Sequence, residues 1–260
     1  MDQELAGKVV VVTGASRGIG LAIVRALVAE GALVVAGVRS PNAELESFGD
    51  RVHVVTGDLA TAEGPGLLVG AAVAAHGRLD VLVNNVGGVR PRLDGVTAVS
   101  DDDWSWAFAT NLMPTVRATR AALPHLLATA PSSVVTISSV NATLPDPAVV
   151  DYSAAKAALS SYSKSLSREV GPLGVRVNTI SPGPVATDLW LGGGGVAETI
   201  AARSGRTPAE VAAGAAADSA TGRFTRPDEV ADLVVLLAGS RAGNATGIDI
   251  RIDGGLVTTL

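Results

Sequence analysis

Short runs of valine, isoleucine and leucine alternate along the chain with longer segments rich in alanine and leucine. Most of the short runs are almost continuously apolar, which is the pattern of parallel strands covered on both faces. We predict seven strands, at residues 8–13, 33–38, 52–56, 79–84, 133–138, 175–180 and 248–252. The longer segments predict helices at residues 17–30, 61–75, 101–128, 152–170 and 227–238.

Polar residues mark the start of two helices. Ser100 precedes three consecutive aspartates, which place a capping side chain and negative charge at the start of the helix 101–128. Residues 207–210, Thr-Pro-Ala-Glu, resemble a capping box with proline at the first helical position. These elements predict an α/β fold: one domain over residues 1–260, with a doubly wound, Rossmann-type parallel sheet of about seven strands and helices on both faces.

One segment, residues 188–221, lacks a clear pattern. It contains four consecutive glycines and a weakly patterned helix rich in alanine and glycine. A simple surface excursion is one interpretation. We favour a mobile substrate lid, because the segment directly follows a predicted cofactor-contacting loop.

Composition narrows the classes of function. Without cysteine, the chain has no disulfides, thiolate metal sites or cysteine nucleophiles, and a cytoplasmic location is expected. Its three histidines are far apart in sequence and form no local metal motif. A net charge of −5 and 3% aromatic residues do not suit a nucleic-acid-binding protein. No apolar run reaches the ~18 residues of a membrane span, and the acidic start is unlike a signal peptide.

A glycine-rich turn follows the first predicted strand. Residues 13–20 read Thr-Gly-Ala-Ser-Arg-Gly-Ile-Gly, and a predicted helix continues from them. Gly14, Gly18 and Gly20 permit a tight turn and a close backbone approach, so that the first N–H groups of the helix can bind a pyrophosphate. This placement predicts a dinucleotide site, with an unliganded glycine turn as the alternative.

The residues at the end of the second predicted strand indicate which dinucleotide, NAD(H) or NADP(H), the site prefers. An acidic residue there would bind the 2′-hydroxyl of the adenosine ribose, but this chain has Val38 followed by Arg39. Arg17 lies in the glycine turn itself. Two guanidinium groups and no carboxylate suit a 2′-phosphate, so we predict a preference for NADP(H) over NAD(H). If Arg39 is only a solvated charge, both cofactors bind.

Tyr152 and Lys156 open a predicted helix and, four residues apart, share one of its faces. An ammonium near a phenol favours the phenolate and lowers its pKa, which suits proton transfer during carbonyl reduction or alcohol oxidation. Ser139 follows a strand end at the edge of the sheet where ligands bind, and can hold the substrate oxygen beside Tyr152. Alone, a tyrosine and lysine at this spacing are more often packing residues; together with the serine and the glycine turn they indicate a catalytic set.

With these residues, the chain resembles the short-chain dehydrogenase/reductase (SDR) family over nearly its whole length. Residues 13–20 resemble the family's TGxxxGIG turn, and residues 84–87 resemble its NNAG motif with valine in place of alanine. Residues 182–187 resemble its PG motif, and residues 223–231 and 246–255 its C-terminal blocks. Ser139, Tyr152 and Lys156 match the catalytic residues, and Asn111 lies where the family keeps a helix asparagine.

The resemblance implies roles for these positions. Tyr152 is the general acid in reduction and the general base in oxidation, Ser139 polarises the carbonyl, and Lys156 lowers the tyrosine pKa and binds the nicotinamide ribose. Asn111 holds a water that links Lys156 to solvent, unless it is only a polar residue at a kink near Pro114. The implied cofactor-binding residues are Gly14, Ser16, Arg17, Gly18, Ile19, Gly20, Arg39, Asp58, Leu59, Asn85, Val86, Gly87, Ile137, Tyr152, Lys156, Pro182, Gly183, Val185 and Thr187.

We expect a neutral or weakly polar carbonyl or secondary alcohol as substrate. The predicted substrate pocket consists of Ser139, Asn141, Val149, Tyr152, Pro184, Leu189 and Trp190. Arg90 and Arg92 could receive an anionic substrate, although solvated loop charges are the more common interpretation. Asp146 and Asp151 flank the site and would oppose a strong anion.

The predicted helix 152–170 has a face of small residues, namely Ala154, Ala155, Ala157, Ala158, Ser161 and Ser165. In the family, this helix and the preceding one usually pair across a two-fold axis, so a homotetramer is expected, with a dimer as the alternative. Two other functions stay open. One is a nucleotide-sensing binding protein without turnover, against which the intact Ser139, Tyr152 and Lys156 argue, and the other is an SDR-type epimerase or lyase.

Overall fold

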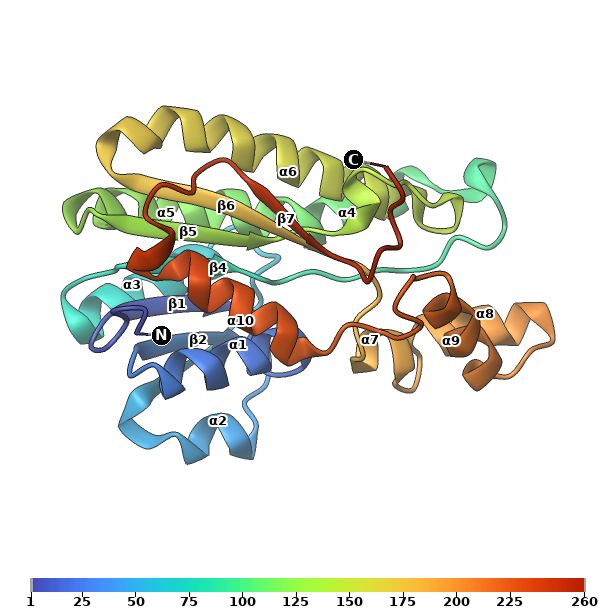
Figure 1. Ribbon diagram of the computed structural model, residues 1–260, viewed down its shortest axis with the longest axis horizontal. Helices are drawn as coiled ribbons and strands as arrows, with labels where there is room; N and C mark the ends of the chain where they lie inside the picture. The colour runs from blue at the N-terminus through green and yellow to red at the C-terminus, as the bar shows by residue number, and fades with distance from the viewer. Residues whose placement is uncertain (1, 260) are drawn as a thin grey trace.

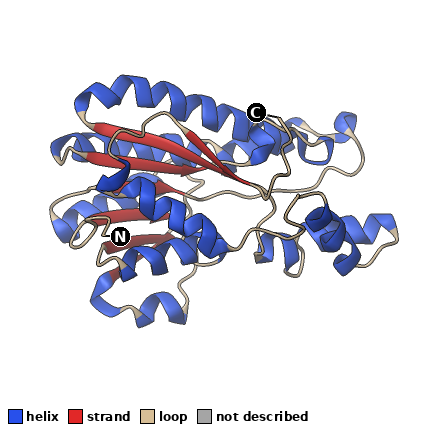
Figure 2. Cartoon of the chain, viewed as in Figure 1, coloured by secondary structure: helices blue, strands red, loops and turns tan. Residues whose placement is uncertain are grey.

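The computed structural model describes residues 2–259 as a single parallel sheet between two layers of helices (Figures 1 and 2). The strands are β1 (Val9–Thr13), β2 (Leu33–Val38), β3 (Val52–Thr56), β4 (Val81–Asn84), β5 (Ser132–Ile137), β6 (Val175–Pro182) and β7 (Asp249–Ile252). The helices are α1 (Gly18–Ala29), α2 (Ala43–Ser47), α3 (Gly64–His76), α4 (Asp101–Asn111), α5 (Met113–Ala128), α6 (Val150–Val170), α7 (Asp188–Leu191), α8 (Val196–Ser204), α9 (Pro208–Ala217) and α10 (Pro227–Ala238).

The strand order is β3-β2-β1-β4-β5-β6-β7, and every neighbouring pair is parallel. The direction of winding reverses between β1 and β4, and a crevice opens at such a point beyond the carboxyl ends of the strands. The doubly wound, seven-stranded sheet predicted from the sequence is therefore confirmed.

Successive side chains of each strand point to opposite faces of the sheet and pack into two separate hydrophobic cores. Val10 and Val12 of β1 pack with α1 and α10, whereas Val9 and Val11 pack with α3, α5 and α6. All four valines are at most 1% exposed. Full burial of such a side chain contributes ~1.5–3 kcal/mol, which is why the strands are nearly continuous runs of valine and leucine.

The predicted helix 101–128 is wrong as one element. The structure divides it into α4 and α5 at Leu112, where the backbone departs from helical geometry. Pro114 lacks the N–H that would bond to the carbonyl of Thr110, so the hydrogen-bond ladder cannot continue through this point. Ser100 caps α4 as predicted and also forms a capping box with Asp103, and the capping box predicted for Thr207 and Glu210 is present.

The segment 188–221 contains three short helices rather than one. Figure 1 shows α7, α8 and α9 grouped beyond the carboxyl ends of the strands, away from the layers that cover the sheet. The short helix α2 was not predicted. Among residues 2–259, no helix has the length and apolar character that crossing a membrane requires.

Candidate active site

A cavity of about 960 Å³ lies at the carboxyl edge of the sheet, where the connections that follow β1 and β4 run to opposite faces. It is lined by all of the residues that were predicted from the sequence to act in catalysis, to bind the cofactor or to form the substrate pocket. Residues from more than ten separate segments therefore meet in one place. Their individual roles stay predictions.

The turn between β1 and α1 forms one end of this cavity. Gly14 and Gly18 have positive φ angles of 69° and 54°, which suit glycine. A Cβ atom on Gly20 would lie 2.1 Å from the carbonyl oxygen of Gly14, so no side chain fits there. Helix α1 starts without a side-chain cap and without an acidic residue in its first turn. Its free N–H groups and the positive end of its dipole thus fit a pyrophosphate, the group that the sequence predicts.

The turn is held in place by the end of β4. The Thr13 hydroxyl accepts hydrogen bonds from the backbone N–H of Asn85, at 2.9 Å, and of Val86, at 3.1 Å. The Asn85 amide donates to the carbonyl oxygens of Thr13 and Gly14, at 3.0 and 2.9 Å. These bonds fix the phosphate-binding turn against the loop that follows β4, and explain why asparagine occupies this position.

Arg17 and Arg39 are both exposed and line the same end of the cavity. Within the described part of the chain, neither forms an ion pair with a protein carboxylate, so both guanidinium groups are available to a ligand. Asp58, nearby at the end of β3, accepts a hydrogen bond from the backbone N–H of Ala60 at 2.9 Å.

Tyr152, Lys156 and Ser139 lie together where α6 passes the end of β5. The hydroxyl of Ser139 donates to Asn141 Oδ1 at 3.2 Å, and its nearness to Tyr152 partly offsets the effect of burial on the tyrosine pKa. The Nζ atom of Lys156 lies 5.8 Å from the centre of the Tyr152 ring and donates to the carbonyl oxygen of Ile137 at 2.9 Å. Lys156 is only 4% exposed. The residues expected to hold a carbonyl oxygen and to transfer a proton thus face one another.

The pKa values differ from the expectation that Lys156 lowers the pKa of Tyr152. Burial dominates, so the pKa of Tyr152 is raised despite the smaller, opposite effect of Ser139. Burial also lowers the pKa of Lys156 to about 8. The effect of Lys156 itself on Tyr152 stays a prediction, because spacing along a helix shows that two side chains are near each other, but not how much desolvation costs each charge.

The lowered pKa of Lys156 predicts an effect on stability. In the unfolded chain its pKa is 10.5, so between pH 8 and 10.5 the unfolded state binds more protons than the folded state. The free energy of unfolding therefore rises with pH through this window, by about 3 kcal/mol in all. Lys156→Met should abolish that rise. The free energy of unfolding of the variant, compared with that of wild type, should therefore be most favourable below pH 8. Urea unfolding at several pH values measures it, and parallel pH dependences of wild type and variant would refute it.

Asn111 ends α4 and is fully buried. Its side-chain amide donates to the carbonyl oxygens of Gly88 and Ala107, at 2.9 and 3.0 Å, and accepts from the N–H of Gly88 at 3.0 Å. A Cβ atom on Gly87 would lie 2.9 Å from Asn111 Oδ1 and 3.6 Å from Lys156 Nζ. Asn111 thus lies at a helix break, as its alternative interpretation stated, and also holds the loop beside Lys156.

Neither interpretation describes Arg92, whereas both stay open for Arg90. Arg92 is inside the protein, in ion pairs with Asp103 at 2.7 Å and Asp151 at 2.5 Å. Arg90 is exposed, but its guanidinium lies 3.8 Å from the centre of the Trp106 ring. The expectation that Asp151 repels an anionic substrate is also wrong, because Asp151 is buried and paired with Arg92.

Several residues of the cavity wall were missed. Trp106 and Thr110 of α4, Ile200 of α8 and Leu256 near the C-terminus line the cavity. Trp106 and Thr110 share one face of α4 but neither belongs to a motif that the sequence ties to the site. Leu256 is brought in by the turn after β7, which no local pattern indicates. The described residues contain no group of three or more potential metal ligands.

The chain was compared with known proteins. The family model described as short chain dehydrogenase matches residues 8–192. The short-chain reductase protein NovJ of Streptomyces niveus is 35% identical over 253 residues, covering 95% of this chain and 93% of NovJ. The 3-oxoacyl-[acyl-carrier-protein] reductase FabG of Salmonella typhimurium is 33% identical, covering 96% of this chain and 97% of FabG. The crystal structure of L-sorbose reductase from Gluconobacter frateurii with NADPH and L-sorbose superposes with a TM-score of 0.90 at 32% identity, covering all of both chains.

Proposed function

The chain belongs to the short-chain dehydrogenase/reductase family, and we propose that it is an NADP(H)-dependent oxidoreductase that interconverts a carbonyl and a secondary alcohol by hydride transfer. Oxidoreduction of a carbonyl or CH–OH group with a nicotinamide cofactor follows from the family. The preference for NADP(H), the catalytic residues and the kind of substrate are proposals.

One observation carries the proposal. Ser139, Tyr152 and Lys156 share one cavity with an uncapped helix N-terminus and a glycine turn that excludes a side chain. Bound there, a nicotinamide dinucleotide supplies the hydride. The protein must then hold the substrate oxygen and move a proton.

Each side chain has a task that its position allows. In reduction, Tyr152 donates its phenolic proton to the substrate oxygen, and in oxidation the phenolate accepts it. Ser139 donates a hydrogen bond to the same oxygen and orients it. Lys156 supports the phenolate that forms at Tyr152 and binds the ribose next to the nicotinamide. Asn111 keeps the loop at Gly88 in place beside Lys156 and holds a water that supplies protons to it.

The preference for NADP(H) rests on Arg17 and Arg39. Both are exposed at the adenosine end of the cavity, where a guanidinium can fork onto phosphate oxygens. L-sorbose reductase, which this chain resembles along its whole length, was crystallised with NADPH. NAD(H) is the second choice.

The substrate end of the cavity favours a neutral or weakly polar carbonyl compound. Val149, Pro184, Leu189 and Trp190 supply apolar wall, and Trp190 packs edge-on against Phe224 with ring centres 5.3 Å apart. Since Arg92 is internally paired, Arg90 is the one arginine left near this end, and Asp146 offsets it.

We propose that residues 188–221 act as the lid of a single domain spanning the chain. Val196 and Ile200 of this segment line the cavity, so its position changes the space open to substrate. We also propose that the protein is cytoplasmic and that it forms a homotetramer, with a dimer as the alternative. Its support is α6, where Ala157, Ser161 and Ser165 are exposed at every fourth position and would let another helix approach closely.

A screen of NADPH oxidation tests the proposed function. The panel contains cyclohexanone, L-sorbose, phenanthrenequinone and acetoacetyl-coenzyme A, which is a 3-oxoacyl thioester. We expect NADPH oxidation with at least one compound. Tight NADPH binding without oxidation across the panel would instead favour a nucleotide-sensing protein, and a changed substrate without net oxidation of NADPH would favour an epimerase or lyase.

A further inference from the structure

Arg92 forms a buried ionic cluster directly behind Tyr152. Its Nε and Nη2 atoms donate to Asp151 Oδ2, at 3.0 and 2.5 Å, and its Nη1 atom donates to Asp103 Oδ1 at 2.7 Å. The exposed fraction is 12% for the Arg92 side chain and 1% for Asp151. Two N–H groups of one planar guanidinium converge on a single carboxylate oxygen, which restricts how the two buried side chains can lie.

The cluster is bonded to the backbone of Tyr152. The second oxygen of Asp151, Oδ1, accepts a hydrogen bond from the N–H of Tyr152 at 2.9 Å. The backbone N–H of Arg92 donates to the carbonyl oxygen of Ala148 at 2.6 Å. The loop after β4 is therefore linked twice to the chain around the first turn of α6.

The second arm of Arg92 reaches α4. Asp103 belongs to the capping box that starts this helix, and Asn111 at its other end bonds to Gly88, four residues before Arg92. Helices α4 and α6 pack against each other. One guanidinium thus connects the starts of the two helices that carry Asn111, Tyr152 and Lys156. Neither Arg92 nor Asp151 lines the cavity itself.

We propose that Arg92 is a positioning residue: through Asp151, it fixes Tyr152 against the cofactor loop and neutralises the carboxylate next to that tyrosine. This inference rests on the proposed function, in which Tyr152 transfers the proton. Without Arg92, the buried negative charge of Asp151 would oppose formation of the phenolate. Without the Asp151 carboxylate, Arg92 stays paired with Asp103 and the cluster loses one of its two negative charges, which would favour the phenolate.

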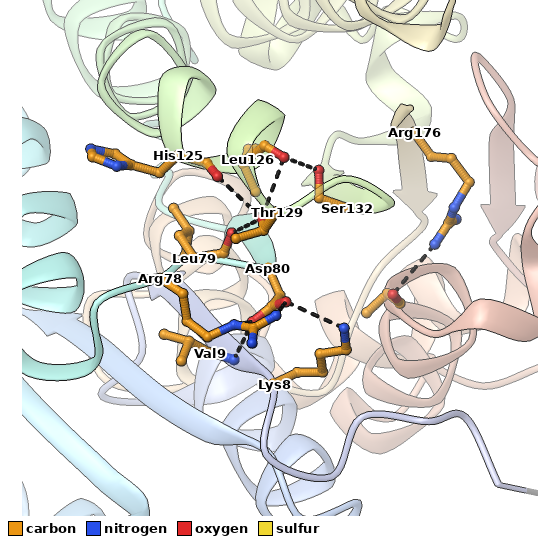
Figure 3. A network of polar contacts seen from close by, with 11 residues as sticks. Lys8, Val9, Arg78, Leu79, Asp80, His125, Leu126, Thr129, Ser132 and Arg176 are labelled. Carbon is orange, nitrogen blue, oxygen red and sulfur yellow. Dashed lines mark hydrogen bonds and ion pairs between the residues drawn. The ribbon is translucent and has the colours of Figure 1, made fainter. Parts of the chain in front are cut away.

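The chain contains a matched control at the opposite edge of the sheet. Arg78 pairs with Asp80 at 2.6 Å, and Asp80 is only 2% exposed, so the pair resembles Arg92 and Asp151 in chemistry and in burial of the acid. Figure 3 shows Arg78 and Lys8 both directed at Asp80, which also accepts a hydrogen bond from the N–H of Val9. Arg78→Met therefore breaks a comparable ion pair far from Tyr152.

The first test follows the ionisation of Tyr152 without any turnover. The chain has two tyrosines, so in a Tyr162→Phe background the ultraviolet titration of tyrosinate reports Tyr152 alone. In that background, Arg92→Met should raise the titration midpoint by about one pH unit, and Asp151→Asn should lower it. Arg78→Met should leave it unchanged. Equal midpoints in all variants, or a shift of both in the same direction, would overturn the proposal.

The second test measures NADPH oxidation with the panel compound that wild type reduces fastest. We expect Arg92→Met to lower kcat at least tenfold with little change in the KM for NADPH, Arg92→Lys to recover part of kcat, and Arg78→Met to retain wild-type kcat. If Arg92→Met does not fold, Arg92→Lys and Asp151→Asn still decide the outcome. Wild-type kcat in those variants would overturn the proposal, whereas an inactive wild type would contradict the proposed function alone.

Discussion

Tyr152→Phe is expected to lower kcat for carbonyl reduction by about 10²- to 10⁴-fold, the contribution typical of a positioned general acid. Phenylalanine keeps the ring in the cavity and removes only the hydroxyl that donates the proton. Ser139 also retains a hydrogen bond to Asn141 Oδ1, at 3.2 Å. The loss should therefore be in chemistry and not in folding or cofactor binding. The measurement is steady-state NADPH oxidation beside NADPH affinity, which should stay within about threefold of wild type.

Tyr162→Phe is the matched control for this change. Tyr162 is on the same helix, ten residues further along, and packs with the core beneath α6. It should retain wild-type kcat. Near-normal turnover in Tyr152→Phe would exclude Tyr152 as the proton donor, and an equal loss in both variants would point to disturbance of α6 instead.

The second large effect concerns the choice of cofactor. Arg39→Asp should lower the ratio of kcat/KM for NADPH to that for NADH by about 10²- to 10³-fold. The variant loses a charge-assisted hydrogen bond to the 2′-phosphate, worth roughly 1.5–3 kcal/mol. It also gains a carboxylate that repels the phosphate and can accept a bond from the 2′-hydroxyl of NAD. Arg17 should maintain part of the preference for NADPH in Arg39→Asp. A variant that also replaces Arg17 should lose the preference.

Arg51→Asp is the control for Arg39→Asp, because it makes the same change in net charge at an exposed position directly before β3. Its cofactor ratio should equal that of wild type. An unchanged ratio in Arg39→Asp, with NADPH still bound, would show that Arg39 is a solvated charge at the end of a strand.

The strands were predictable because burial on both faces leaves a strong local signal. All seven appear within about two residues of their predicted ends, as the runs around Val10 and Val35 are apolar without interruption. The break between α4 and α5 was expected only as a kink near Pro114 in the alternative interpretation of Asn111, since helix-forming residues lie on both sides of it and a single proline decides it. The lid was poorly predicted because alanine and glycine carry little periodicity.

The residues of the site were predictable where a motif is tied to a strand end. The glycine turn follows β1, and Ser139 follows β5, so topology alone brings them to one edge of the sheet. The role of Arg92 was not predictable, because its partner Asp151 is 59 positions away and nothing in their spacing shows that they meet. The raised pKa of Tyr152 was not predictable for a related reason: the extent of burial is a property of the assembled fold.

The central claim is that this chain reduces a carbonyl compound with NADPH and that Tyr152 supplies the proton. The most direct test is NADPH oxidation by wild type and Tyr152→Phe against the carbonyl panel, with NADPH affinity measured for both proteins. Oxidation by wild type that falls at least 10²-fold in the variant, at similar NADPH affinity, is the predicted result. Equal rates in the two proteins, or no oxidation by a wild type that binds NADPH, would contradict it.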